Sequence, residues 1–253
     1  MRLAVAGGTG LVGTYVVEVA RAAGHEVVSL SRKAGVDVQT GAGLRIALEG
    51  VEVVIDTLNT RARKRAAAED FFHETSRQLQ QAGTAAGVQH LVTLSILGID
   101  RADAYGYYQA KLAQERAVSQ GPVPASILRA SQFYEFPAQL MQMLRRGPFV
   151  VLPRMRSQPV AARTVAEHLV RLAEERPAER VELAGPEVHD VADLARRMAA
   201  ARGARLRIIA VPLPGRSGAQ MRGDALLATP STPIDGPAFA EWLASPDAQR
   251  VPF

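Results

Sequence analysis

The first thirteen residues constrain the fold of this chain more than any other stretch. Residues 3–6 are small and apolar, which is typical of a strand buried on both faces of a parallel sheet. Gly7, Gly10 and Gly13 follow at three-residue spacing, before a run with the composition of a helix. A strand, a glycine turn and a helix N-terminus form a cradle for the pyrophosphate of a dinucleotide. A purely structural turn is the alternative, but this order of elements favours dinucleotide binding.

The composition narrows the classes of protein and site. At 253 residues the chain is long enough for one large α/β domain, or for a core with a small appendage. No apolar run approaches the roughly 18–20 residues of a membrane helix, and the apolar start already serves as the first strand, so we expect no signal peptide. The chain has no cysteine, and its five histidines form no ligand pair at helical spacing. We therefore expect no metal site, no membrane partner and a cytoplasmic location.

The charge of the chain is basic, with a net value of +5. The densest basic stretch is Arg61-Ala-Arg-Lys-Arg65. It lacks the interleaved aromatic residues and the reading motif of a nucleic-acid interface. We expect a solvated loop that helps to attract an anionic cofactor, and no nucleic-acid partner.

The end of the second predicted strand, residues 25–30, bears on which cofactor binds. In dinucleotide-binding folds an acidic residue about 20 positions beyond the glycine motif binds the ribose hydroxyls and selects NAD. Here the strand is followed by Ser31, Arg32 and Lys33, without an acid. A hydroxyl and two cations suit a 2′-phosphate, which favours NADP(H) and leaves NAD(H) possible. The alternative is that both cations are simply exposed turn residues.

Two further strands, at residues 51–57 and 91–97, are predicted to end at the carboxyl edge where cofactors lie. The first is followed by Leu58 and Asn59, the only asparagine of the chain, and the second carries Ser95 near its end. An amphipathic helix at 69–86 separates them.

Tyr107 and Lys111 are the candidate catalytic pair. They lie four residues apart, and therefore on one face of a helix predicted over 105–115. An ammonium beside the phenol favours the phenolate, so we expect Lys111 to lower the pKa of Tyr107 and to improve it as a proton donor to a carbonyl oxygen. Ser95 is a candidate second partner of that oxygen. The alternative is an interface tyrosine beside a surface lysine.

The rest of the chain predicts a substrate pocket and several elements. After a strand at 125–130, the chain should leave the sheet beside the nicotinamide, and four apolar side chains there are candidate pocket residues, although core packing would use the same residues: Phe133, Tyr134, Phe136 and Met141. Strands are predicted at 149–152, 180–183 and 206–211, helices at 160–170, 191–202 and 237–244, and a proline-rich turn at 212–215.

Taken together, the glycine turn, the basic end of the second strand, Ser95 and Tyr107-xxx-Lys111 resemble the short-chain dehydrogenase/reductase superfamily, and within it the atypical NmrA-like branch of NAD(P)-binding oxidoreductases. The likeness covers the whole chain. Segments 129–133, 159–166 and 183–186 look like the C-terminal half of that branch.

The resemblance implies an α/β fold, a Rossmann-type doubly wound parallel sheet with a small α/β C-terminal substrate lobe. Residues 1–130 would be the NADP-binding domain and residues 131–253 the substrate-binding lobe, interleaved with it in one compact unit. Tyr107 would be the acid/base, Lys111 would orient the nicotinamide ribose, and Ser95 would bind the reacting oxygen. The cofactor-binding residues would be Gly7, Thr9, Gly10, Leu11, Val12 and Gly13 at the pyrophosphate, Ser31 and Arg32 at the 2′-phosphate, and Asp56, Leu58 and Asn59 along the adenosine side.

One departure concerns the asparagine of the superfamily's fuller catalytic set, which is absent from the helix before the Ser95 strand. A proton relay through that asparagine is therefore not expected here. The resulting hypothesis is an NADPH-dependent reductase of a carbonyl or quinone-type, apolar or aromatic small molecule. A non-redox epimerase, dehydratase or isomerase and a cofactor sensor that binds a partner protein are the alternatives. A homodimer is a further possibility.

Overall fold

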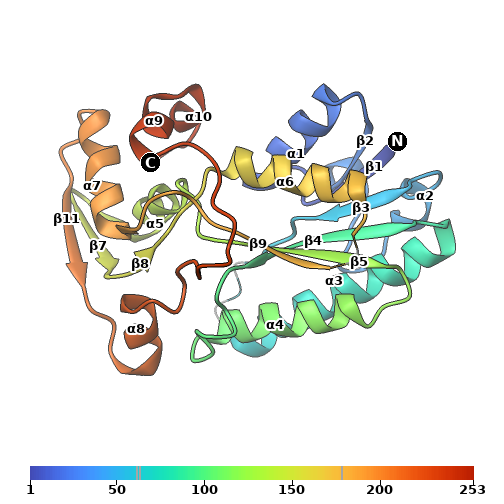
Figure 1. The fold of residues 1–253 in the computed structure, drawn as a ribbon, viewed down its shortest axis with the longest axis horizontal. Helices are drawn as coiled ribbons and strands as arrows, with labels where there is room; N and C mark the ends of the chain where they lie inside the picture. The colour runs from blue at the N-terminus through green and yellow to red at the C-terminus, as the bar shows by residue number, and fades with distance from the viewer. Residues whose placement is uncertain (61, 63, 178) are drawn as a thin grey trace. The chain divides into compact units, whose positions relative to one another are not determined.

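The computed structural model describes residues 1–60, 62, 64–177 and 179–253. Its largest feature is a six-stranded parallel sheet (Figure 1). In sheet order the strands are β2 (Glu26–Leu30), β1 (Arg2–Ala6), β3 (Val53–Asp56), β4 (His90–Ile96), β5 (Ala125–Ala130) and β9 (Arg180–Leu183). The chain passes from β1 to β2 on one side and returns to β3 on the other. The strand order therefore reverses between β1 and β3, where ligands bind in open α/β sheets. The predicted Rossmann-type fold is confirmed.

The first of two compact units comprises residues 1–96, 105–129 and 163–181. Helices α1 (Leu11–Ala22) and α6 (Ala162–Glu175) cover one face of its sheet, and α3 (Arg65–Ala86) and α4 (Gly106–Ser119) cover the other (Figure 1). The short helices η1 (Arg32–Ala34) and α2 (Leu44–Ala47) connect β2 to β3. Helix α6 follows residue 130 in sequence, yet it belongs to this unit.

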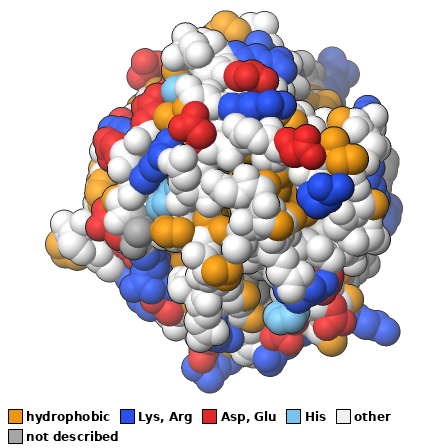
Figure 2. All heavy atoms as spheres, turned by 90° about the vertical axis from the view of Figure 1, so that its right-hand side faces the viewer, with side chains coloured by type: hydrophobic (Ala, Val, Ile, Leu, Met, Phe, Trp, Pro, Cys, Tyr) orange, Lys and Arg blue, Asp and Glu red, His pale blue; other side chains and the backbone are white. Residues whose placement is uncertain are grey.

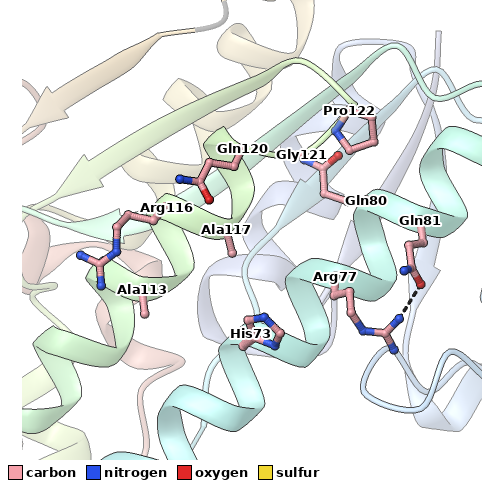
Figure 3. A pocket seen from close by; sticks show the side chains of 10 residues that line it. All are labelled: His73, Arg77, Gln80, Gln81, Ala113, Arg116, Ala117, Gln120, Gly121 and Pro122. Carbon is pink, nitrogen blue, oxygen red and sulfur yellow. Dashed lines mark hydrogen bonds between the residues drawn. The ribbon is translucent and has the colours of Figure 1, made fainter.

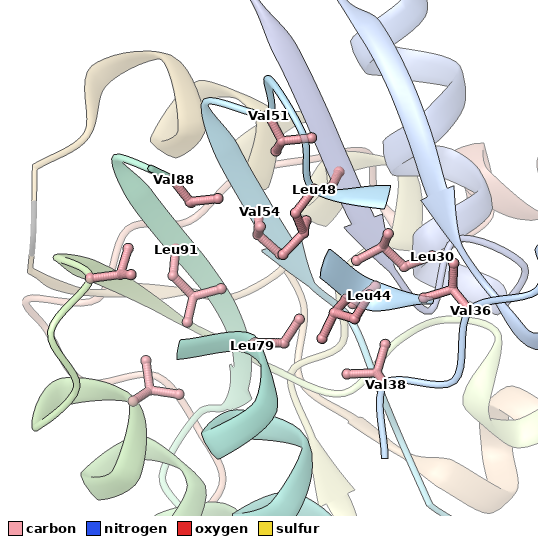
Figure 4. Close-up of a cluster of buried hydrophobic side chains, with 14 residues drawn as sticks. Leu30, Val36, Val38, Leu44, Leu48, Val51, Val54, Leu79, Val88 and Leu91 are labelled. Atoms are coloured by element: carbon pink, nitrogen blue, oxygen red, sulfur yellow. The ribbon is translucent and has the colours of Figure 1, made fainter. Parts of the chain in front are cut away.

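The core of the first unit forms because the strands are apolar on both faces. Leu30, Val54 and Leu91 from three strands meet Leu44 of α2 and Leu79 of α3, and all five side chains are at most 2% exposed (Figure 4). Burial of each such side chain contributes roughly 1.5–3 kcal/mol. This packing fixes the strand ends that carry the candidate site.

The second unit comprises residues 97–104, 130–162 and 182–253. Its strands are β6 (Arg145–Arg146), β7 (Phe149–Pro153), β8 (Arg156–Ser157), β10 (His189–Asp190) and β11 (Arg207–Val211), paired as β11-β7-β6 and β10-β8. Its helices are α5 (Phe136–Leu144), α7 (Val191–Ala201), α8 (Gly215–Arg222), α9 (Phe239–Ala244) and α10 (Pro246–Gln249). Tyr134, Phe239 and Trp242 pack together at centroid distances of 5.2–5.6 Å in its core.

Most predicted elements are present within a few residues of their expected bounds. Helices α3 and α8 differ from the prediction, and the short elements β6, β8, β10 and α10 were not predicted either. Helix α3 begins at Arg65, four residues before the expected start, because its first turn is alanine-rich and its N-cap residue makes no capping hydrogen bond that would mark the start. Helix α8 lies immediately after the predicted proline-rich turn and was not predicted. Its buried residues are only Gly218 and Met221, so its sequence has no apolar stripe.

The surface seen in Figure 2 carries basic and acidic side chains that are interspersed rather than gathered by sign. Of the basic run at 61–65, Arg61 and Arg63 lie outside the described residues, and Arg65 forms an ion pair with Glu69 at 2.7 Å. Among the described helices, none is long and apolar enough to span a bilayer.

Candidate active site

The glycine turn joins β1 to α1, and each of its glycines has a different physical role. Gly7 has φ of +79°, a conformation that favours glycine. A Cβ on Gly13 would lie 2.1 Å from the carbonyl oxygen of Gly7, so only glycine lets α1 approach the turn this closely. A Cβ on Gly10 would meet only that same oxygen, at 3.2 Å, so the missing side chain leaves the front of the helix open.

The N-terminus of α1 fits a pyrophosphate. The helix has no side-chain N-cap and no acidic residue in its first turn, so its first N–H groups and the positive end of its dipole remain available to an anion. Thr9 and Gly10 are exposed at this end, while Val12 and Gly13 are buried beneath it. All six predicted pyrophosphate residues lie in this turn: Gly7, Thr9, Gly10, Leu11, Val12 and Gly13.

The end of β2 lies beside this turn, because Leu30 pairs with Ala6, the residue before Gly7. Ser31 then starts the short helix η1, which carries Arg32 and Lys33. Both cations are exposed, and neither has a hydrogen-bond or ion-pair partner in the described part of the chain. The two cations are thus placed beside the glycine turn and available to an anion.

The end of β3 connects the turn to Tyr107. The hydroxyl of Thr57 donates a hydrogen bond of 2.8 Å to the carbonyl oxygen of Ala6, and a Cβ on Gly7 would lie 3.0 Å from that hydroxyl. Two residues further on, Asn59 Oδ1 accepts a hydrogen bond of 2.6 Å from the Tyr107 hydroxyl. The glycine turn and Tyr107 are therefore linked through Thr57 and Asn59 at one edge of the sheet, at its switch point.

The pKa of Tyr107 is raised, not lowered as the sequence predicted. Burial and the neighbouring Tyr105 raise it, and the hydrogen bond with Asn59 opposes them in part. The expected effect of Lys111 is wrong because its ammonium points elsewhere: Nζ donates to the carbonyl oxygen of Leu94 at 2.7 Å and to Gln114 Oε1. Tyr107 is accordingly a neutral phenol at physiological pH.

Lys111 is anchored inside the protein. It is 4% exposed, and burial lowers its pKa to about 8 against the opposing charges of Asp56 and Glu115. Gln114 links Lys111 to Asp56: its Oε1 accepts from the Lys111 ammonium, and its Nε2 donates to Asp56 Oδ2 at 3.0 Å. Burial also raises the pKa of Asp56, whose Oδ1 accepts the Leu58 N–H. Both carboxylate oxygens of Asp56 are thus engaged within the protein, and its role at the adenosine side stays a prediction.

Ser95 lies in a different set of contacts. It is 1% exposed, and its hydroxyl donates to Glu115 Oε1 at 2.5 Å. Glu115 also pairs with the guanidinium of Arg129, at 2.9 Å from Nε and 2.7 Å from Nη2. We call Ser95, Glu115 and Arg129 the buried cluster. No hydrogen bond joins the Ser95 hydroxyl to Tyr107 or Lys111 in the described residues, and its role at the reacting oxygen stays a prediction.

The sequence did not single out Gln114, Glu115 and Arg129, which hold the predicted site residues Lys111, Asp56 and Ser95 in place. Glu115 had a signal, since it follows Tyr107 and Lys111 at four-residue intervals and so lies on the same helical face. Arg129 had none, because it stands within a strand whose other residues are apolar or small.

The four candidate pocket residues belong to the second unit. Tyr134 and Met141 are at most 1% exposed, and the Tyr134 hydroxyl donates to the carbonyl oxygen of Pro237 at 3.0 Å. These two placements favour core packing, the alternative given above. Phe133 and Phe136 are half-buried, and a pocket role for them stays a prediction.

A groove of about 440 Å³ lies between α3 and α4 on the first unit (Figure 3). His73, Arg77 and Arg116 are among its lining side chains, and Arg77 bonds Gln81 within it. It contains none of the predicted site residues. Among the described residues, no three His, Asp or Glu side chains gather as a metal site would require.

The comparisons with known proteins agree with this geometry. A model of the NAD(P)H-binding family matches residues 7–177, a range that includes the glycine turn, Asn59, Tyr107 and Lys111. The chain belongs to this family. A search of curated proteins found no match.

Several solved structures share the fold of this NAD(P)H-binding protein. A short-chain dehydrogenase/reductase superfamily protein from Agrobacterium tumefaciens, solved with bound NAD, has a TM-score of 0.65 at 21% identity and covers 85% of this chain and 86% of its own. A dTDP-4-dehydrorhamnose reductase from Clostridium acetobutylicum has a TM-score of 0.71 at 15% identity, and the match covers 86% of this chain and 88% of the reductase. A Thermus thermophilus UDP-glucose 4-epimerase, in complex with NAD, has a TM-score of 0.66 at 18% identity, and the match covers 86% of this chain and 88% of the epimerase. These likenesses show that the chain shares its fold with structures of the superfamily that the sequence resembles, while the NmrA-like branch stays a prediction.

Proposed function

We propose that the chain is an NADPH-dependent reductase that transfers hydride to a carbonyl or quinone-type carbon of an apolar or aromatic small molecule, with Tyr107 as the acid. The observation that carries this proposal is the path from the glycine turn through Thr57 and Asn59 to the Tyr107 hydroxyl. It brings a dinucleotide cradle and a proton donor to the same switch point of the sheet.

The protein's own residues bind the cofactor and manage one proton. When bound, NADPH supplies the hydride, with its electron pair, to the substrate carbon. The π electron pair of the C=O bond moves onto the oxygen, which takes the Tyr107 proton, and solvent later restores that proton. Burial keeps the pKa of Tyr107 high, so the phenol still carries its proton at neutral pH.

Lys111 has a supporting role in this proposal. An ammonium has three N–H donors, and two of those of Lys111 are engaged by Leu94 and Gln114. Nζ also lies 4.7 Å from the centroid of the Phe72 ring, so a bond from the third N–H to a ribose hydroxyl of the cofactor would replace this cation–π contact. The preference for NADPH is supported by the exposed Arg32 and Lys33 beside the turn, where NAD-selective folds place an acid.

The first test is NADPH oxidation by the wild type, Tyr107→Phe and the matched control Tyr105→Phe over a panel of quinones, aromatic ketones and aldehydes, with NADH in parallel. Loss of a general acid lowers turnover by roughly 10²–10⁴-fold, so we expect that loss in Tyr107→Phe alone. Tyr105 is 43% exposed and neighbours Tyr107 without bonding Asn59, so its variant controls for changes in aromatic packing.

Three outcomes would contradict the proposal. Near-full turnover in a folded Tyr107→Phe would exclude this residue as the acid. Product formation without net NADPH consumption would favour an epimerase, dehydratase or isomerase. NADPH binding without turnover on any compound would favour a cofactor sensor. The cytoplasmic location and a homodimer remain predictions, to be checked by cell fractionation and by light scattering.

A further inference from the structure

The orientation of the Asn59 side-chain amide is fixed by a backbone group. The N–H of Thr60 lies 2.7 Å from one atom of that amide, and because a backbone N–H can only donate, this atom is the oxygen, Oδ1. The Tyr107 hydroxyl lies 2.6 Å from the same oxygen, so Tyr107 is the donor of that bond. Asn59 Nδ2 therefore keeps both of its N–H donors, with no acceptor for them in the described part of the chain.

Ser95 offers no such donor. A serine hydroxyl has one proton, and that of Ser95 is held by Glu115 Oε1 at 2.5 Å in a buried carboxylate pair. Ser95 is 1% exposed, whereas Asn59 is exposed at the end of β3. A ligand that approaches the Tyr107 hydroxyl meets the Asn59 amide, because the two groups touch.

We propose that Asn59 Nδ2, rather than the Ser95 hydroxyl, is the second hydrogen-bond donor to the reacting oxygen of the substrate. The proposal rests on the reductase function proposed above. The Tyr107 hydroxyl proton turns from Asn59 Oδ1 to the substrate oxygen, and the Thr60 N–H continues to hold Oδ1. Asn59 transfers no proton. Its amide stabilises the negative charge that develops on the oxygen as hydride reaches the carbon.

This role makes Asn59, at the end of β3, a catalytic residue. The sequence resemblance instead implies that Asn59 lies along the adenosine side of the cofactor. The two roles differ in what they affect. A donor to the reacting oxygen lowers kcat at saturating NADPH when it is lost, while an adenosine contact weakens NADPH binding and leaves that kcat unchanged.

The test compares Asn59→Ala, Asn59→Asp and Ser95→Ala, with 9,10-phenanthrenequinone and the best substrate of the panel as electron acceptors. Asn59→Asp is the sharper variant, because the carboxylate keeps an acceptor for Thr60 and Tyr107 but has no donor at neutral pH. We expect kcat to fall about 10²–10³-fold in both Asn59 variants, because removal of one hydrogen-bond donor to a developing oxyanion has an effect of this size. The NADPH Kd should stay within about twofold of wild type. In Ser95→Ala we expect a smaller loss of kcat and a lower melting temperature.

A kcat of Asn59→Ala within about threefold of wild type would overturn the inference, as would a loss explained by a raised NADPH Kd, or a larger kcat loss in Ser95→Ala. If Tyr107→Phe is inactive in those same experiments, the reductase proposal still stands. If the wild type oxidises NADPH with no compound, the reductase proposal fails and the inference fails with it.

An NMR measurement tests the contact itself without a substrate. Asn59 is the only asparagine of the chain, so ¹⁵N-asparagine labelling gives a single pair of side-chain amide signals. We expect this pair to shift in Tyr107→Phe, because Oδ1 loses a donor, and to stay in place in Tyr105→Phe. Identical signals in wild type and Tyr107→Phe would overturn the inference.

Discussion

Two polar regions of the first unit use the same helix, α4, in opposite ways. One is the open edge, which we define as the glycine turn with Asn59 and Tyr107. The other is the buried cluster of Ser95, Glu115 and Arg129. Tyr107 and Glu115 lie on one face of the helix, two turns apart. At the open edge donors remain unengaged, whereas in the buried cluster the serine proton and both carboxylate oxygens of Glu115 are engaged within the protein.

The difference shows that chemical type does not assign function by itself. A serine near a tyrosine and a lysine in sequence suggests catalysis. Here, however, the carboxylate of a buried ion pair accepts the hydrogen bond of the serine hydroxyl. Buried polar groups must be satisfied within the protein, while groups at a strand end retain capacity for a ligand. The three predictions below test this division between stability and binding.

The largest effect is expected from Glu115→Ala, which leaves the Arg129 guanidinium, 2% exposed, without its partner. Loss of one member of a buried ion pair costs roughly 3–5 kcal/mol in the free energy of unfolding. Urea unfolding measures it. Glu69→Ala is the matched control, because its ion pair with Arg65 is solvent-exposed and is worth about 1 kcal/mol or less.

A double variant, Glu115→Met with Arg129→Met, sharpens this result, since apolar replacement of both partners is often neutral. If Glu115→Ala instead keeps its stability and loses only turnover, the buried cluster belongs to the catalytic machinery and the division between the two regions fails.

An intermediate effect is expected from Gly13→Ala, which tests the open edge. The added Cβ would lie 2.1 Å from the Gly7 carbonyl oxygen, so the turn must shift at a cost of roughly 1–3 kcal/mol. We expect weaker NADPH binding, measured by fluorescence titration of the folded variant. The control is Gly83→Ala in α3, where a Cβ meets only side chains at 3.5 Å or more. Unchanged NADPH affinity in Gly13→Ala would contradict the cradle.

The smallest effect is a pH dependence that Lys111 contributes. Its pKa is lowered by burial to about 8 from 10.5, so between these values the unfolded chain binds one more proton than the folded chain. The stability of wild type relative to Lys111→Met should therefore rise from about pH 8 to about pH 10.5 and stay constant below and above this range.

¹³C-lysine NMR checks the titration directly, since the chain has three lysines and Lys111→Met identifies the signal. A midpoint near 10.5 would show that Lys111 is solvated, and would place it with the open edge rather than with the protein interior.

The sequence by itself determined the fold and the cofactor cradle. Apolar strands, glycines at three-residue spacing and a following helix are local signals, and short-range sterics decide their outcome. The same local logic placed Tyr107 and Lys111 on one helical face, because the period of a helix does not depend on the rest of the molecule.

Only the tertiary structure decided the partners of those side chains. The hydrogen bond of Tyr107 with Asn59 spans 48 residues, and the Ser95 hydroxyl donates to a carboxylate 20 residues further along the chain. The direction of the Tyr107 pKa shift followed from burial rather than from its sequence neighbour Lys111. Burial and long-range hydrogen bonds depend on how strands and helices pack, and no spacing along the chain encodes them.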